Sequence, residues 1–176
     1  MDGYEKLPRL SFRQAVSECF RKCAKFSGRA RRSEFWWWMS IQVICACCVC
    51  VCSVCAACCE EETYVEAVLS GLCICIIVVL TIPSLAVTWR RLHDTGRPGW
   101  LVIVPLVLFV YLAMCEYLQG WGLYVVGENV EAFLFWVWRI CSLVLIVLCC
   151  FDSDKEENKY GPSPKYSKEE WASQEE

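Results

Sequence analysis

The stretch Gly28-Arg-Ala-Arg-Arg-Ser-Glu-Phe-Trp-Trp-Trp38 joins a basic segment to a long apolar one. It holds three arginines, one glutamate and three tryptophans, and mostly apolar residues follow it as far as Cys59. Arginines beside tryptophans at the start of such a segment are typical of the cytoplasmic boundary between water and lipid. The stretch therefore predicts a membrane protein and gives the direction of its first span.

Four segments of the 176-residue chain reach the length that an apolar helix needs to cross a bilayer, which is about 20 residues. Backbone polar groups in lipid must be hydrogen-bonded within their own segment, so each segment predicts an α-helix. We expect an all-α membrane protein with four transmembrane helices, at residues 36–59, 67–88, 100–118 and 132–151. A basic segment, residues 1–35, precedes this domain, and an acidic tail, residues 152–176, follows it.

The positive charges indicate how the spans are oriented. Residues 1–35 contain nine Lys or Arg and the loop at 89–99 contains three, whereas the loops at 60–66 and 119–131 contain none. The positive-inside rule then places both termini in the cytoplasm. A cleaved signal peptide is the alternative for the first span, since Cys55-Ala-Ala-Cys58 is loosely similar to a lipoprotein cleavage site. The 35-residue basic lead and the length of the span argue against cleavage.

The chain is rich in cysteine, with 16 in all and eight of them between Cys45 and Cys59. They alternate with Val and Ala and have no histidine beside them. A free cysteine in such surroundings behaves as a small hydrophobic residue. We therefore interpret most of these thiols as packing residues and expect no metal site and no cofactor. Cys58 and Cys59, next to three glutamates at the membrane edge, are the strongest exception.

Residues 11–25 predict an amphipathic helix ahead of the first span. One face is apolar, and Ser11 with Gln14 matches a capping box. The apolar face consists of Phe12, Ala15, Val16, Cys19, Phe20 and Cys23. A basic amphipathic helix next to a span lies either in the headgroup plane or against the ends of the transmembrane helices. Both arrangements remain open from the sequence.

Three polar motifs fall on the predicted cytoplasmic side. They are FSGRARRSEFWW at residues 26–37, RRLHDTGRPGW at 90–100 and NKYGPSP at 158–164. Their order resembles the bacterial inner-membrane family catalogued as domain of unknown function 805, the YhaH-like proteins. The resemblance extends over roughly residues 12–164. It implies a multi-pass protein of the bacterial inner (plasma) membrane with polar cytoplasmic motifs, and it implies no established activity.

The arginines of these motifs suggest a binding surface for anionic headgroups or phosphate, because Arg binds phosphate bidentately. The candidates are Arg29, Arg31, Arg32, Arg90, Arg91 and Arg97, supported by Glu34, His93, Asp94 and Asn158. The alternative is that these arginines orient the helices and pair with Glu34, Asp94 and helix C-terminal carbonyls. We expect a structural or interaction role at the cytoplasmic leaflet, with anionic phospholipid as a candidate partner.

Two other functions have weaker signals. His93 beside Asp94 suggests acid–base catalysis, but neighbouring residues on a helix point apart, and only Ser33 and Thr95 offer a nucleophile. Glu116 and Arg139 lie within spans, where charges mark candidate transport paths. We expect a structural pair between them, and a small transporter or channel is the alternative function. We predict no enzyme activity and no nucleic-acid partner, and a homo-oligomer remains open.

Overall fold

The computed structural model describes residues 4–57 and 63–168. Five α-helices, one short 3-10 helix and two short strands occur in these ranges. In chain order they are β1 (Tyr4–Lys6), α1 (Phe12–Arg21), α2 (Arg32–Ala57), α3 (Thr63–Asp94), η1 (Gly99–Val102), α4 (Ile103–Gln119), α5 (Glu128–Cys150) and β2 (Tyr166–Lys168). Four of the helical segments are long and apolar enough to cross a membrane, at Arg32–Cys52, Gly71–Asp94, Gly99–Gln119 and Glu128–Cys150.

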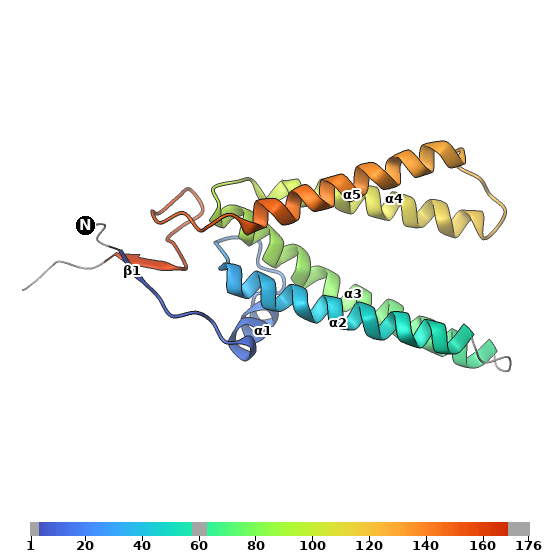
Figure 1. Ribbon diagram of the computed structural model, residues 1–176, viewed down its shortest axis with the longest axis horizontal. Helices are drawn as coiled ribbons and strands as arrows, with labels where there is room; N and C mark the ends of the chain where they lie inside the picture. The colour runs from blue at the N-terminus through green and yellow to red at the C-terminus, as the bar shows by residue number, and fades with distance from the viewer. Residues whose placement is uncertain (1–3, 58–62, 169–176) are drawn as a thin grey trace, which may run out of the picture.

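The four long helices form two pairs that diverge. Helix α2 lies along α3, and α4 lies along α5 (Figure 1). The pairs meet at the end that also carries α1, β1 and the segment after α5, and they separate toward the opposite end (Figure 1). We call the shared end the polar end. The four helices therefore do not form one compact bundle. The two pairs are joined at the polar end alone and separate beyond it.

Helix α3 continues six residues past the expected end of the second span, to Asp94. The loop predicted at 89–99 is thus shorter, since its charged residues belong to the last turns of the helix. The helix ends in a Schellman motif, in which Arg97 N donates to Leu92 O at 2.9 Å and Gly96 N donates to His93 O at 3.1 Å. Gly96 has a φ of +71°, which only glycine adopts without strain.

The next turn is held by a close contact between Gly99 and Trp89. A Cβ on Gly99 would lie 2.2 Å from the indole Nε1 of Trp89. The indole is also in edge contact with the rings of Phe26 and His93, at 5.6 and 6.1 Å between ring centroids. The start of the second helix pair therefore packs directly on α3, and only glycine fits at position 99.

Helix α1 begins at Phe12 as expected but ends at Arg21, four residues before the predicted end. The capping box is formed, with Ser11 N donating to Gln14 Oε1 at 3.0 Å and Gln14 N donating to Ser11 Oγ at 3.4 Å. Phe12 and Phe20 make edge contacts with Trp37 and Trp38 of α2. The helix thus packs on the beginning of α2.

Two strands that the sequence did not predict close the polar end. β1 pairs with β2 in antiparallel register, with Lys6 opposite Tyr166. Leu7 N donates to Lys165 O at 3.0 Å and extends the pairing by one hydrogen bond. This short sheet brings residues from near the start of the chain beside the segment that follows α5.

Of the described cysteines only Cys19, Cys115 and Cys149 are buried, so a packing role inside the protein holds for these three, and the others are half-buried or exposed. Each cysteine whose side chain the structure describes is a free thiol. No group of three or more metal-ligating side chains occurs among the described residues. Cys58 and Cys59 lie outside the described residues, so the exception suggested for them stays a prediction.

Candidate functional site

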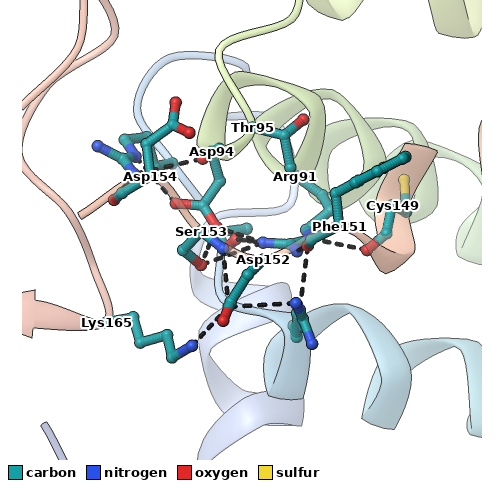
Figure 2. A network of polar contacts seen from close by, with 12 residues as sticks. Arg91, Asp94, Thr95, Cys149, Phe151, Asp152, Ser153, Asp154 and Lys165 are labelled. Carbon is teal, nitrogen blue, oxygen red and sulfur yellow. Dashed lines mark hydrogen bonds and ion pairs between the residues drawn. The ribbon is translucent and has the colours of Figure 1, made fainter. Parts of the chain in front are cut away.

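Asp94, the last residue of α3, is the centre of a buried ionic cluster at the polar end. Its carboxylate is fully buried. Oδ1 accepts a hydrogen bond from Arg29 Nε at 2.9 Å. Oδ2 accepts from Arg91 Nη1 and from the hydroxyl of Ser153, which comes just after α5 (Figure 2). One carboxylate thus lies between two guanidinium groups from different parts of the chain. It joins the end of α3 to the segment before α2 and to the segment after α5.

Arg91 also closes the C-terminal end of α5. Its Nε donates to Cys149 O at 3.0 Å, and its Nη2 donates to Phe151 O (Figure 2). Arg32 Nε reaches Phe151 O as well, at 3.0 Å. The last carbonyls of a helix have no partner inside the helix and carry partial negative charge. Two arginines from α2 and α3 therefore cap α5, and this capping joins the two helix pairs.

Arg29 holds the segment that follows α5. Its Nη1 donates to Glu156 O at 2.9 Å and Gly161 O at 3.2 Å, and its Nη2 donates to Asp154 O at 2.6 Å. Its guanidinium is nearly fully buried, so these carbonyls and Asp94 replace its water. The segment 154–161 is thus wrapped around one arginine side chain.

The motif NKYGPSP takes part in the same wrapping. Asn158 Nδ2 donates to His93 O at 3.0 Å, and Asn158 Oδ1 accepts from Tyr160 N at 2.9 Å. The Tyr160 ring stacks on His93, with centroids 3.6 Å apart and planes 4° apart. Gly161, at a φ of +118°, allows the chain to turn there. The third motif is therefore a docking segment for the end of α3.

His93 and Asp94 point in different directions, as their adjacent positions on a helix predict. His93 Nδ1 lies 3.2 Å from the carbonyl oxygen of Gly28, so this nitrogen carries the proton and donates. Thr95 Oγ1 donates to Leu92 O at 3.0 Å. The side chains of His93 and Asp94 thus bind different partners and do not contact each other for acid–base chemistry. The packing of the imidazole between Trp89 and Tyr160 gives it a structural place.

A second buried ion pair lies beside the first cluster. Arg90 Nη1 contacts Glu34 Oε1 at 2.7 Å, and both side chains are at most 4% exposed. The thiol of Cys19 on α1 points toward this carboxylate, with its sulfur 3.9 Å from Oε1. Burial raises the pKa of Cys19 to about 12, so the thiol stays protonated. The pair joins α1, α2 and α3.

The six candidate arginines therefore fall into three groups. Arg29, Arg90 and Arg91 are buried in ion pairs with Asp94 or Glu34. Arg97 lies over the ring of Phe151, with its guanidinium carbon 4.6 Å from the centroid. Arg31 and Arg32 line an open groove. The arrangement leaves these last two as the candidates that an anion from solution or from the membrane surface can reach.

The groove has a volume of about 440 Å³ and lies between the end of β1, the first turn of α2 and two residues that follow α5, Asp152 and Lys165. We call it the basic groove. Its lining consists of Lys6, Leu7, Arg9, Arg31, Arg32, Ser33, Trp36, Asp152 and Lys165. Sequence reasoning missed Lys6, Arg9 and Lys165, because these residues lie outside the motifs and only the pairing of β1 with β2 brings Lys6 beside Lys165. The only signal for Lys6 and Arg9 was the basic character of residues 1–35, and Lys165, in the acidic tail, had none.

Electrostatics at the basic groove favour an anion. Asp152 is its single carboxylate, and it pairs with Lys165 and, at 3.2 Å, with Arg32. Burial acts to raise the pKa of Asp152, but hydrogen bonds from Lys165 and the Ser153 backbone outweigh it and hold the pKa below its ordinary value. The first turn of α2, with Arg32 and Ser33, lines the groove, so the positive end of the helix dipole also faces it. The groove therefore keeps an excess of positive charge.

Glu116 and Arg139 do not form the pair that the sequence suggested. Among the described residues neither side chain takes part in an ion pair within 4 Å. Arg139 instead lies over the rings of Phe135 and Trp138, at 5.3 and 5.9 Å from their centroids. Aromatic faces on the same helix attract the guanidinium. The expected structural pair is thus wrong.

Comparison with known proteins identifies the family of this chain. The model of the family described as "Protein of unknown function (DUF805)" matches residues 23–162, which include all the parts of the buried cluster. The chain belongs to this family. As a DUF805 protein it keeps its ionic cluster within the matched segment, whereas Lys6, Arg9 and Lys165 of the basic groove lie outside it.

Three curated relatives of this DUF805 protein come from Escherichia coli K12. Inner membrane protein YhaH is 27% identical over 141 residues, which cover 80% of this chain and 87% of YhaH. Inner membrane protein YhaI is 28% identical over 141 residues, covering 80% and 86%. Uncharacterized protein YiiR is 30% identical over 137 residues, covering 77% and 83%. No solved structure matches the chain.

Proposed function

We propose that the chain is a four-span protein of the bacterial inner membrane whose polar end faces the cytoplasm and binds the headgroup of an anionic phospholipid. The basic groove carries this proposal, because it gathers five basic side chains around one carboxylate. The side chain of Trp36 lines the groove and is 44% exposed at the start of the first span. Tryptophan prefers the headgroup level of a membrane, so a headgroup is the anion nearest to the groove.

The chemistry of the lining fits a phosphate group. Arginine presents a planar fork of N–H donors that matches two phosphate oxygens. Arg31 Nη1 already donates to Pro8 O at 2.6 Å, which fixes the guanidinium beside Lys6 and Arg9. Each basic residue near a negative surface contributes about 1 kcal/mol to attraction. The groove thus supports lipid binding without a catalytic step.

The buried cluster supports the proposal indirectly. Arg32 is held by Phe151 O and Asp152, and Lys165 is held by Asp152. Asp152 directly precedes Ser153, whose hydroxyl donates to the buried Asp94. The internal ion pairs therefore position two walls of the groove relative to α2. In this proposal Arg29, Arg90 and Arg91 serve as positioning residues and do not contact the lipid.

Removing two charges from the groove is expected to weaken anionic lipid binding. In Lys6→Gln/Arg9→Gln, the affinity for phosphatidylglycerol in nanodiscs should fall roughly tenfold or more, since each charge contributes about 1 kcal/mol. Binding is measured as the phosphatidylglycerol retained per protein, titrated against phosphatidylcholine. Equal retention by the wild type and this variant would overturn the groove as the binding site.

The matched control is Arg13→Gln/Lys25→Gln, which makes the same charge change on the same basic segment but outside the groove. It should retain the wild-type preference for phosphatidylglycerol. Inorganic phosphate serves as a competitor that distinguishes a lipid headgroup from a free phosphate compound. Phosphate at millimolar concentration should leave retention unchanged if the lipid is the ligand, and full displacement would identify free phosphate instead.

The proposed orientation has a separate test. A reporter that is active only outside the cytoplasm, fused after Glu176, should stay inactive, because loops rich in Lys and Arg remain in the cytoplasm. The same reporter inserted between Gly122 and Leu123, in the connection between α4 and α5, should be active. Activity at the C-terminal fusion would contradict the orientation without bearing on the geometry of the groove.

A further inference from the structure

A cavity of about 450 Å³ lies between α2 and α3, away from the polar end, and it is open on one side, where Ala46 and Cys50 are exposed. Its wall is apolar apart from two polar side chains, Gln42 and Thr81, at one edge. The remaining lining residues are Cys45, Ala46, Val49, Cys50, Ile76, Ile77 and Leu80. Small-molecule pockets in proteins are commonly about 300–1,000 Å³ and mostly apolar with a few polar groups. The cavity has both properties.

The cavity lies in the hydrocarbon part of the first span. Gln42 comes six residues after Trp36, the residue placed at the headgroup level. At a rise of about 1.5 Å per residue this places it roughly 9 Å further along the helix. A bilayer core is about 30 Å thick, so Gln42 lies inside it, about a third of the way across. A polar atom without a partner at that depth costs several kcal/mol.

Hydrogen bonds around Ser84 fix which way the Gln42 amide faces. Trp38 Nε1, which can only donate, donates to Ser84 Oγ at 2.9 Å. The Ser84 hydroxyl uses its one proton to donate to Leu80 O. The amide of Gln42 must therefore donate to the remaining lone pair of Ser84, and its Nε2 does so. Gln42 Oε1 is consequently directed away from Ser84.

The polar edge of the cavity then offers acceptor atoms and the second amide proton of Gln42, a set that one hydroxyl group can match because it both donates and accepts. No donor among the described residues reaches Gln42 Oε1. Thr81 donates its hydroxyl proton to Ile77 O at 2.7 Å, which leaves only acceptor sites on its oxygen. A plain acyl chain offers no donor, and a charged group is costly at this depth. The complementary ligand is neutral and apolar and carries one hydroxyl.

We propose that the α2–α3 cavity binds a neutral lipophilic alcohol or phenol, with its hydroxyl donating to Gln42 Oε1 and its apolar body between Ala46, Val49 and Ile77. The small side chains of Cys45, Ala46 and Cys50 leave the space that the body fills. The cysteines in this part of α2 therefore also keep the cavity open, because larger side chains there would fill it.

The test uses a pair of photoreactive probes in phosphatidylcholine nanodiscs. One is a long alkane with a mid-chain hydroxyl and a diazirine, and the other is its methyl ether, which cannot donate. The alcohol should label the peptides that contain Val49 and Ile77 roughly three- to tenfold more than the ether, which is the range for one hydrogen bond in a membrane. Equal labelling by the two probes would overturn the proposal.

Two kinds of variant test the hydrogen bond to Gln42 and the volume of the cavity separately. Gln42→Leu should abolish the preference for the alcohol, because it removes the acceptor and leaves the Trp38–Ser84 bond in place. Gln119→Leu, the same change outside the cavity, should keep it. Ala46→Phe should reduce labelling by both probes. A preference that persists in Gln42→Leu, in protein with a wild-type unfolding midpoint, would overturn the role of Gln42.

Discussion

Asp94→Asn is expected to destabilise the protein by about 3–5 kcal/mol, because it removes the charge that compensates two buried guanidinium groups. Arg29 and Arg91 both contact this carboxylate, and all three side chains are at most 1% exposed. Asparagine has nearly the same shape, so the change tests charge and not volume. Its amide nitrogen would also face the donors of Arg91 and Ser153, which then lose the acceptor oxygen that they share.

The loss should be seen in two measurements. The midpoint of denaturant unfolding in detergent should fall, and trypsin should cleave faster at Lys155 and Lys159, since the segment wrapped around Arg29 is released. Glu116→Gln is the matched control, because Glu116 is exposed and has no ion pair among the described residues. Its effect should stay within about 0.5 kcal/mol. An Asp94→Asn variant as stable as this control would contradict the structural role of the cluster.

Gly99→Ala is expected to destabilise the junction between the helix pairs by about 1–3 kcal/mol or more. The added methyl would overlap the indole of Trp89, at 2.2 Å from Nε1. Contacts with Phe26 and His93 keep that indole from moving aside. The unfolding midpoint of Gly99→Ala in detergent measures the effect.

Two comparisons make the result specific. Gly71→Ala adds the same methyl group on α3, where no atom lies within 4 Å, and should be neutral or slightly stabilising. A smaller side chain at position 89 should partly restore Gly99→Ala, so Trp89→Leu/Gly99→Ala should lose less than the sum of its two single changes. Additive losses would show that the contact with Trp89 is not the cause.

The membrane-spanning helices could be predicted from the sequence because their signal is local. Each expected span overlaps one long helix of the structure, and α1 begins at the predicted Ser11 cap. The end of α3 was less predictable. Arg90, Arg91 and Asp94 are typical of a loop at a membrane surface, yet they continue the helix, because Glu34 and Arg29 from the N-terminal side satisfy their charges.

The candidate site was predictable as a region and not in detail. The three motifs do meet at one end, and Asn158 does contact the end of α3. Their arginines, however, are alike in sequence, and nothing local distinguishes the buried Arg29 from Arg31, which lines the groove. The pairing of β1 with β2, which brings in Lys6 and Lys165, joins residues more than 150 positions apart and leaves no mark in any single segment.

The sequence by itself determined that this is a membrane protein with four apolar helices, because hydropathy and helix length act over about twenty adjacent residues. Its motifs also determined the family. Tertiary structure alone decided which arginines are buried, how the two helix pairs diverge, and that one acceptor in the α2–α3 cavity meets no donor from the described part of the chain. Ion pairs and hydrogen bonds depend on partners that lie far away along the chain, and only folding brings those partners together.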